Sequence, residues 1–305
     1  MLLLVLLFTP GVAQPMQADA SAVDSAPLNQ AKTLIREGKT GQADAAVRAY
    51  LQAGHDGATA RALLGLILYQ EGRGADSLAE FTHAAKFRTP SASDLIVVGL
   101  DYVLLRDLGN ADKWMTIATQ RAPENASAWQ YLGGIKYSEN RFAEAIAAYD
   151  KCLSLHPHDV LVEDAIGRSL EGLGQDQDAA AAYRKALSWQ ADAQTKSAQP
   201  LLHLGALLAR QGQLESALPL LISAAAAAPK NADIHEQLGT VYLQLRQLPK
   251  AQSEVEMALA LSPGNSHLHW LLASIYRAEG RGNEADREMQ RYGALLGAHS
   301  SDKLH

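Results

Sequence analysis

The stretch ASAWQYLGGIKYSENRFAEAIAAYDKCLSLHPHD, residues 126–159, contains the pattern that decides the fold. Its apolar residues recur every three or four positions on both sides of Asn140, which predicts two short amphipathic helices joined by a turn. Asn140 suits a helix end that needs a positive φ. Pro157 is expected to end the second helix, because proline has no N–H to donate onward.

The same arrangement recurs about eight times between residues 24 and 293, in repeats that start near residues 24, 58, 92, 126, 160, 198, 232 and 266. In seven repeats a small residue follows an apolar one, another small residue comes twelve positions later, and a large apolar residue comes four positions after that. The first small residues are Gly65, Gly99, Gly133, Gly167, Gly205, Gly239 and Ala273; the second are Ser77, Ala111, Ala145, Ala179, Ala217, Ala251 and Ala285; the large residues are Phe81, Met115, Tyr149, Tyr183, Leu221, Val255 and Met289. Small side chains at fixed places predict close helix crossings, and apolar stripes that one repeat cannot bury predict that repeats stack.

The fourth repeat shows the pattern most fully, and its order of residue types resembles the tetratricopeptide repeat family. The residues that carry the resemblance are Trp129, Leu132, Gly133, Ala145, Tyr149 and Pro157. The resemblance implies an all-α, right-handed α-solenoid of about eight helix-turn-helix repeats. The first and last repeats depart from the pattern, as expected of units with one face in water. We expect residues 294–305 to be a C-terminal cap or tail, and residues 193–200, where one spacing stretches to 38, to be a longer loop and the hinge.

The N-terminus resembles an export signal. Residues 2–8 are an apolar run, and small residues follow it, so residues 1–13 are expected to be a signal peptide cleaved before Gln14. A second candidate site precedes Ser21, and residues 14–25 are expected to be a flexible leader. The run is too short to span a bilayer, so no membrane span is expected after its removal. No basic residue precedes the run, and the alternative is an N-terminal cap helix on a cytoplasmic protein.

Composition and motifs argue against most other classes of function. A net charge of -6 without a basic run argues against nucleic-acid binding. The only cysteine, Cys152, is expected to be a small buried thiol. The pairs His156/His158 and His267/His269 lack evident further ligands, so they are expected to be loop and cap residues rather than a metal site. No catalytic or phosphate-binding motif occurs, and we expect neither an enzyme nor a cofactor.

In solenoids of the family, the first helix of each repeat lines an inner groove, and the resemblance implies that specific places of that helix face a ligand. In repeats two to four these places are mostly apolar, and the predicted groove residues are Leu66, Tyr69, Ile96, Leu100, Val103, Gln130 and Tyr137. The first helix of the third repeat carries more apolar residues than stacking requires. The same places in repeats five to eight are more polar, with Asp164, Arg168, Glu171, Arg210, Glu236 and Arg277.

These observations predict an exported, non-enzymatic scaffold that binds a protein or peptide segment in its concave groove. The alternative is an accessory subunit of a cell-envelope assembly or enzyme complex that contacts its partners through its convex face. Substitutions in the groove distinguish the two, because they abolish partner binding only under the first interpretation.

Overall fold

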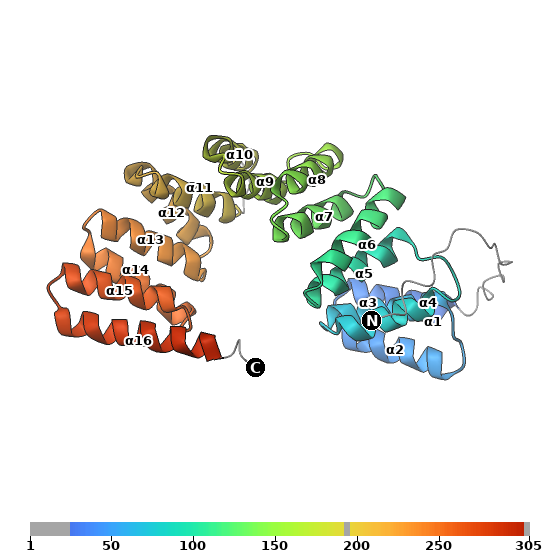
Figure 1. The fold of residues 1–305 in the computed structure, drawn as a ribbon. Coiled ribbons are helices and arrows are strands. Elements are labelled where there is room, and N and C mark those ends of the chain that lie inside the picture. Colours follow the sequence, from blue (N-terminus) through green and yellow to red (C-terminus); the bar gives the residue numbers. More distant parts are fainter. Residues whose placement is uncertain (1–24, 192–195, 302–305) are drawn as a thin grey trace. The chain divides into compact units, whose positions relative to one another are not determined.

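A computed structural model describes residues 25–191 and 196–301 of the chain, and the regular elements in these ranges are sixteen α-helices. The expected signal peptide, nearly all of the expected leader and the middle of the inserted loop lie outside the described residues. Consecutive helices form hairpin pairs, which stack on their neighbours within each of two compact units (Figure 1). Within the described ranges, no helix combines the length and the apolarity that crossing a bilayer requires.

The first unit ends at Leu155 and contains four helix pairs. Their helices are α1 (Ser25–Arg36) with α2 (Thr40–Gln52), α3 (Ala58–Gln70) with α4 (Gly74–Ala84), α5 (Ala92–Leu104) with α6 (Leu108–Arg121), and α7 (Ala126–Ser138) with α8 (Phe142–Leu155). Two clusters of buried residues form its core, one centred on Ile67 and the other on Met115. The apolar core is therefore spread along the stack of pairs, as expected of a repeat protein.

The second unit begins at His156 and also contains four pairs. Its helices are α9 (Val160–Gly172) with α10 (Asp176–Trp189), α11 (Gln199–Arg210) with α12 (Leu214–Ala227), α13 (Ala232–Gln244) with α14 (Leu248–Leu261), and α15 (Ser266–Ala278) with α16 (Gly282–Ser301). Helix α16 continues through most of the segment expected as a cap or tail. The base of the inserted loop is closed by buried Gln190, whose side-chain amide exchanges two hydrogen bonds of 2.8 and 3.0 Å with the Ser197 backbone.

The turn inside every pair has the same backbone shape. Its fifteenth residue, counted from the repeat starts, has a positive φ in all eight repeats, and these residues are Gly38, Gly72, Arg106, Asn140, Gly174, Gly212, Arg246 and Gly280. Six of these residues are glycine or asparagine, and the positive φ expected at Asn140 is confirmed. Arg106 and Arg246 adopt φ values of 58° and 59°, although this conformation is costly for a residue with a β-carbon.

Polar residues cap the first helix of most repeats. Ser91 forms a capping box with Asp94 at the start of α5, in which each side chain accepts a hydrogen bond from the other residue's backbone N–H. Asn125, Asp159, Asn231 and Asn265 accept from the first backbone N–H groups of α7, α9, α13 and α15. Because each of these four residues comes two positions after a proline, the end of one pair and the start of the next are specified together.

Close packing within six of the eight pairs depends on a repeated glycine. A β-carbon placed on Gly133 would lie 2.5 Å from Cε1 of Tyr149, and one on Gly167 would lie 2.4 Å from Cε1 of Tyr183. The corresponding contacts of the other glycines involve the large apolar residue sixteen positions later: Gly65 with Phe81, Gly99 with Met115, Gly205 with Leu221 and Gly239 with Val255. The two helices of a pair therefore approach closely at this crossing.

Contacts between polar and charged side chains supplement this packing. Arg61, His235 and His269 occupy the same place in three repeats, and each contacts the glutamate nineteen residues later, Glu80, Glu254 or Glu288, at 3.0, 2.7 and 2.6 Å. In the first unit, buried Lys136 and Arg141 both contact Asp112, at 2.8 and 2.7 Å. Burial raises the pKa of Asp112, but hydrogen bonds from these two cations outweigh it and lower the pKa overall.

Candidate binding surface

The residues predicted to line the groove lie on α3, α5 and α7, the first helices of three consecutive pairs in the first unit. Helices α3 and α5 contact each other directly. Six of the seven residues are half-buried, and Val103 is 37% exposed. We call Leu66, Tyr69, Ile96, Leu100, Val103, Gln130 and Tyr137, together with their exposed neighbours Leu104 and Tyr131, the helix-A strip.

Part of the strip also belongs to the core. Ile96 and Leu100 are half-buried and pack against the buried cluster around Leu95 and Met115. Leu100 therefore lies on the border between core and surface, because a helix face turns gradually from one to the other. The more exposed apolar residues are Val103 and Leu104, which is 46% exposed at the end of α5.

Two tyrosines connect the strip across helices. Burial is the main cause that raises the pKa of Tyr69 on α3, and the nearby Tyr131 on α7 and Asp101 on α5 raise it further. Tyr131 is 40% exposed, while the ring of Tyr137 packs edge-on against Phe142 at 5.5 Å. Tyr131 thus belongs to the strip, although its exposed ring was not among the main predicted positions.

The strip presents hydrogen-bonding groups in addition to apolar area. The side-chain polar atoms of Tyr69, Gln130 and Tyr131 make no hydrogen bond among the described residues. The residues of the strip carry no charge. An arrangement of exposed aliphatic groups beside unpaired hydroxyl and amide groups can bind a segment that offers both apolar side chains and free backbone groups.

A carboxyl group lies under the strip. Asp101 is completely buried on α5, and its Oδ2 lies 2.6 Å from Oγ of Ser77 on α4. Ser77 Oγ is also 2.8 Å from the carbonyl oxygen of Gly65 on α3. The other carboxyl oxygen, Oδ1, has no hydrogen-bond partner within the described ranges. Sequence inspection did not single out Asp101, because a lone aspartate on an apolar helix is usually exposed.

The corresponding helix surface of the second unit is different, because its polar residues contact one another. Nδ1 of His203 on α11 lies 2.8 Å from Oδ1 of buried Asp164 on α9, and Arg210 on α11 contacts Glu171 on α9. Glu236 on α13 contacts two residues from the start of α15, Asn265 at 2.9 Å and His267 at 2.8 Å. Four of the six charged residues predicted at groove places, Asp164, Glu171, Arg210 and Glu236, thus link neighbouring helices.

The histidine pairs have separate environments. His267 is exposed and contacts Glu236, whereas His269 is buried and contacts Glu288, as expected of residues two apart on a helix. His158 packs edge-on against Trp189 in a loop. Among the described residues no group of three or more His, Cys, Asp or Glu side chains is placed to hold a metal ion. Cys152 is buried, as predicted.

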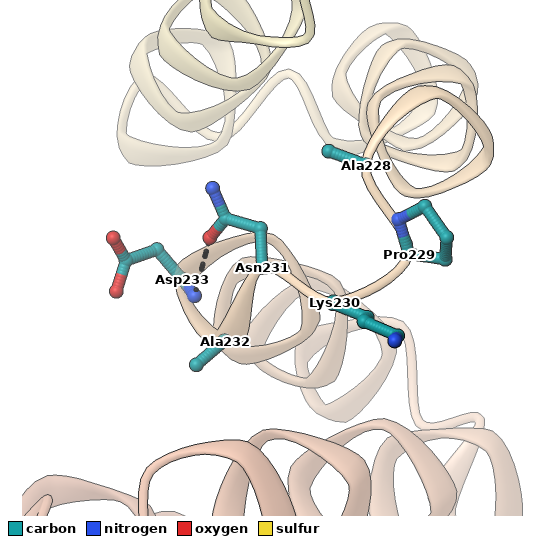
Figure 2. Close-up of a pocket in the computed structure, with 6 residues that line it drawn as sticks. All are labelled: Ala228, Pro229, Lys230, Asn231, Ala232 and Asp233. Atoms are coloured by element: carbon teal, nitrogen blue, oxygen red, sulfur yellow. Dashed lines mark hydrogen bonds between the residues drawn. The ribbon is translucent and has the colours of Figure 1, made fainter. Parts of the chain in front are cut away.

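An open hollow of about 580 Å³ lies at the loop between α12 and α13 (Figure 2). Ala228 to Asp233 line it, and the first turn of α13 forms one side. The backbone N–H groups that a helix start offers to an anion are already occupied here, because Oδ1 of Asn231 accepts from Asp233 and Ile234. The hollow is therefore a feature of the inter-repeat loop, beside a helix start that already has its own capping residue.

Helix pairs with one turn geometry and, in six of eight pairs, a glycine at the helix crossing define a helical-repeat protein. A tetratricopeptide repeat model matches residues 28–93, 99–160 and 236–286, more than half of the chain, and two further tetratricopeptide repeat models match residues 165–192 and 208–260. The chain belongs to the tetratricopeptide repeat family. No curated protein matches it in sequence.

Solved structures share the fold. A chain of the APC/C hetero-tetramer Cut9-Hcn1 matches with a TM-score of 0.64 and 19% identity over 91% of this chain, which spans 54% of that one. PilW, a type IV pilus biogenesis factor, matches with a TM-score of 0.60 and 21% identity over 68% of this chain and 94% of PilW. MamA from Desulfovibrio magneticus RS-1 matches with a TM-score of 0.50 and 22% identity over 57% of this chain and 96% of MamA. At these identities the similarity concerns the fold alone.

Proposed function

We propose that the chain is an exported, non-enzymatic scaffold that binds a segment of another protein on the helix-A strip of its first unit. The observation that carries the proposal is the run of exposed apolar residues at the end of α5, beside unpaired tyrosine and amide groups on α3 and α7. Membership of a repeat family whose solved members include a subunit of the APC/C hetero-tetramer and PilW supports a role in protein assemblies. The apolar residues 2–8 support export.

The chemistry of the strip indicates the kind of segment. The strip carries no charged residue, so its attraction is mainly apolar and should depend little on salt. Gln130 and the two tyrosine hydroxyls can pair with backbone groups, which an extended peptide leaves free. The expected partner segment is therefore extended, with aliphatic or aromatic side chains at alternate positions, and without a charge cluster.

The decisive experiment is selection of binders from a displayed library of random peptides, followed by affinity measurements on the selected peptides. Val103→Asp introduces a carboxylate at an exposed place and should lower affinity by about 30-fold or more, because a carboxylate buried against an apolar peptide loses its hydration. Phe87→Asp is the matched control, since Phe87 is 52% exposed after α4 and outside the strip. Circular dichroism and melting must show that both variants remain folded.

The outcomes separate the candidate functions. Loss of binding in Val103→Asp but not in Phe87→Asp supports the strip. The reverse result supports contacts away from the helix-A surface, as an accessory subunit of a larger assembly would make. Selection of charged peptides whose binding weakens strongly with salt contradicts the apolar mode of binding.

A further inference from the structure

Asp101, Ser77 and Gly65 form a buried link between three helices beneath the strip. Asp101 follows Leu100 on α5 and is two residues before Val103, so the strip and the carboxyl group share one helix. Its Oδ2 contacts Ser77 Oγ at 2.6 Å, and Ser77 Oγ contacts the Gly65 carbonyl oxygen at 2.8 Å. Any change in this link therefore acts on the packing of α5 against α3 and α4.

The link works best when the carboxyl group is protonated. A carbonyl oxygen only accepts hydrogen bonds, and Ser77 has a single hydroxyl proton. If Ser77 donates that proton to the Gly65 carbonyl, the short contact to Asp101 requires a proton from the carboxyl group. An ionised Asp101 would instead compete for the hydroxyl proton, and its Oδ1 would be a buried charge without a partner among the described residues.

The groups around Asp101 do not compensate for a negative charge. Asp101 raises the pKa values of two titratable side chains, Tyr69 on α3 and Tyr102 on α5. On α4, the side chain that contacts Asp101 is Ser77. Asp107, the residue that caps α6, also raises the pKa of Tyr102, so it adds negative charge to this region instead of compensating for that of Asp101. Burial is the main cause that raises the pKa of Asp101, and no cation among the described residues lowers it.

We propose that protonation of Asp101 controls how firmly α5 is held, and thereby whether the helix-A strip is formed for binding; this regulation rests on the proposed function of the strip. At acidic pH Asp101 is protonated and α5 stays packed against α3 and α4, which we call the closed state; in the open state α5 has separated from them. As the pH rises, α5 opens more often, because the open state releases a proton that the closed state retains.

The expected pH range follows from the burial of the carboxyl group. Burial is the main cause that raises the pKa of Asp101 from 3.8 to about 7, and a hydrogen bond donated by Ser77 to the ionised carboxylate acts in the opposite direction. Between these two values the closed state holds one proton more than the open state. The population of the open state should therefore rise about tenfold per pH unit between pH 5 and pH 7 and level off above pH 7.

Hydrogen exchange measured by mass spectrometry tests this on the full chain, with rates corrected for the intrinsic effect of pH. Peptides from α5 of the wild-type chain should lose protection about tenfold per pH unit up to pH 7. Asp101→Asn keeps a hydrogen-bonding side chain without a titratable proton, so the protection of α5 in this variant should no longer depend on pH. Asp107→Asn, which keeps a capping residue before α6, should retain the wild-type slope.

Ser77→Ala is the second test, and it remains informative if Asp101→Asn fails to fold. The hydroxyl contacts Asp101 whether the carboxyl group is protonated or ionised, so its removal should change the pKa of Asp101 and move the pH at which the loss of protection levels off. Three results would overturn the proposal. These are protection of α5 in the wild-type chain that does not change with pH, protection in Asp101→Asn that still falls with pH, and a loss of protection in Ser77→Ala that levels off at the same pH as in the wild type. Because exchange is measured without a partner, these results are independent of whether Val103→Asp impairs peptide binding.

Discussion

Two adjacent glycines in α7 should respond in opposite ways to the same substitution. Ala is favoured over Gly inside a helix by about 1 kcal/mol. Gly134 has room for a methyl group, since a β-carbon there would lie at an ordinary contact distance, 3.8 Å, from the nearest atom, Oη of Tyr149. Gly134→Ala should therefore increase the free energy of unfolding by about 0.5–1 kcal/mol.

Gly133→Ala should not increase the free energy of unfolding, because the strain it introduces outweighs the gain in helix propensity. The new methyl group would lie 2.5 to 2.8 Å from three ring carbons of Tyr149, which is buried. Overpacking of this kind costs about 1–3 kcal/mol. Both substitutions have the same effect on the unfolded chain, so the difference between the two variants, about 1–3 kcal/mol, measures the strain at the helix crossing.

The assay is urea unfolding followed by circular dichroism, with hydrogen exchange of α7 and α8 to locate the effect in the first unit. Exchange is needed because a chain with two compact units does not have to unfold in one step. If Gly133→Ala is as stable as Gly134→Ala, the close crossing is not what requires glycine, and the reasoning is wrong.

A double variant tests the partner directly. The eighth repeat has Ala273 and Met289 where the fourth has Gly133 and Tyr149. Gly133→Ala combined with Tyr149→Met reproduces that pair and should be less destabilised than the sum of its single variants. A double-mutant cycle with no coupling would show that the ring of Tyr149 is not the source of the strain.

Three further expectations concern other parts of the chain. Arg246→Gly should raise the free energy of unfolding by about 1 kcal/mol, because glycine adopts a positive φ without strain; an unchanged urea midpoint would contradict this. Asp112→Asn should lower the stability of the first unit by about 1–3 kcal/mol at pH 7, since it removes the nearer charged partner of buried Lys136 and leaves it Glu144 at 3.4 Å. This loss should shrink in unfolding experiments as the pH falls through the lowered pKa of Asp112, where the wild-type carboxylate is itself protonated. N-terminal sequencing of the exported protein should find Gln14 or Ser21 first, and intact residues 1–13 on a cytoplasmic protein would refute export.

The fold could be predicted because the repeat makes each local signal appear several times. One glycine after a leucine means little, but the same pair in phase with a small residue and a large one specifies a helix crossing. The turn at Arg246 was missed for a physical reason. Arginine rarely adopts a positive φ, and only the helices packed on either side of the turn impose this conformation.

The helix caps could have been found from the sequence. Asn125, Asp159, Asn231 and Asn265 each follow a proline by two positions, and this spacing predicts a stop followed by a new helix start. The pairs that join Asp164 to His203 and Glu236 to His267 could not. They lie 39 and 31 residues apart, and their contacts depend on how far one repeat rotates against the next.

The difference between these pairs and the helix-A strip explains why we assign binding to the first unit. In the second unit, polar residues at the predicted groove places satisfy one another, so a ligand would have to break contacts such as that of His203 with Asp164. In the first unit, Val103 and Tyr131 are exposed without partners that a ligand must displace. The buried carboxyl group of Asp101 underneath adds no attraction for a ligand, but it makes the stability of α5 depend on a proton. Binding and regulation thus rest on opposite faces of the same helix, and each can be altered while the other is measured.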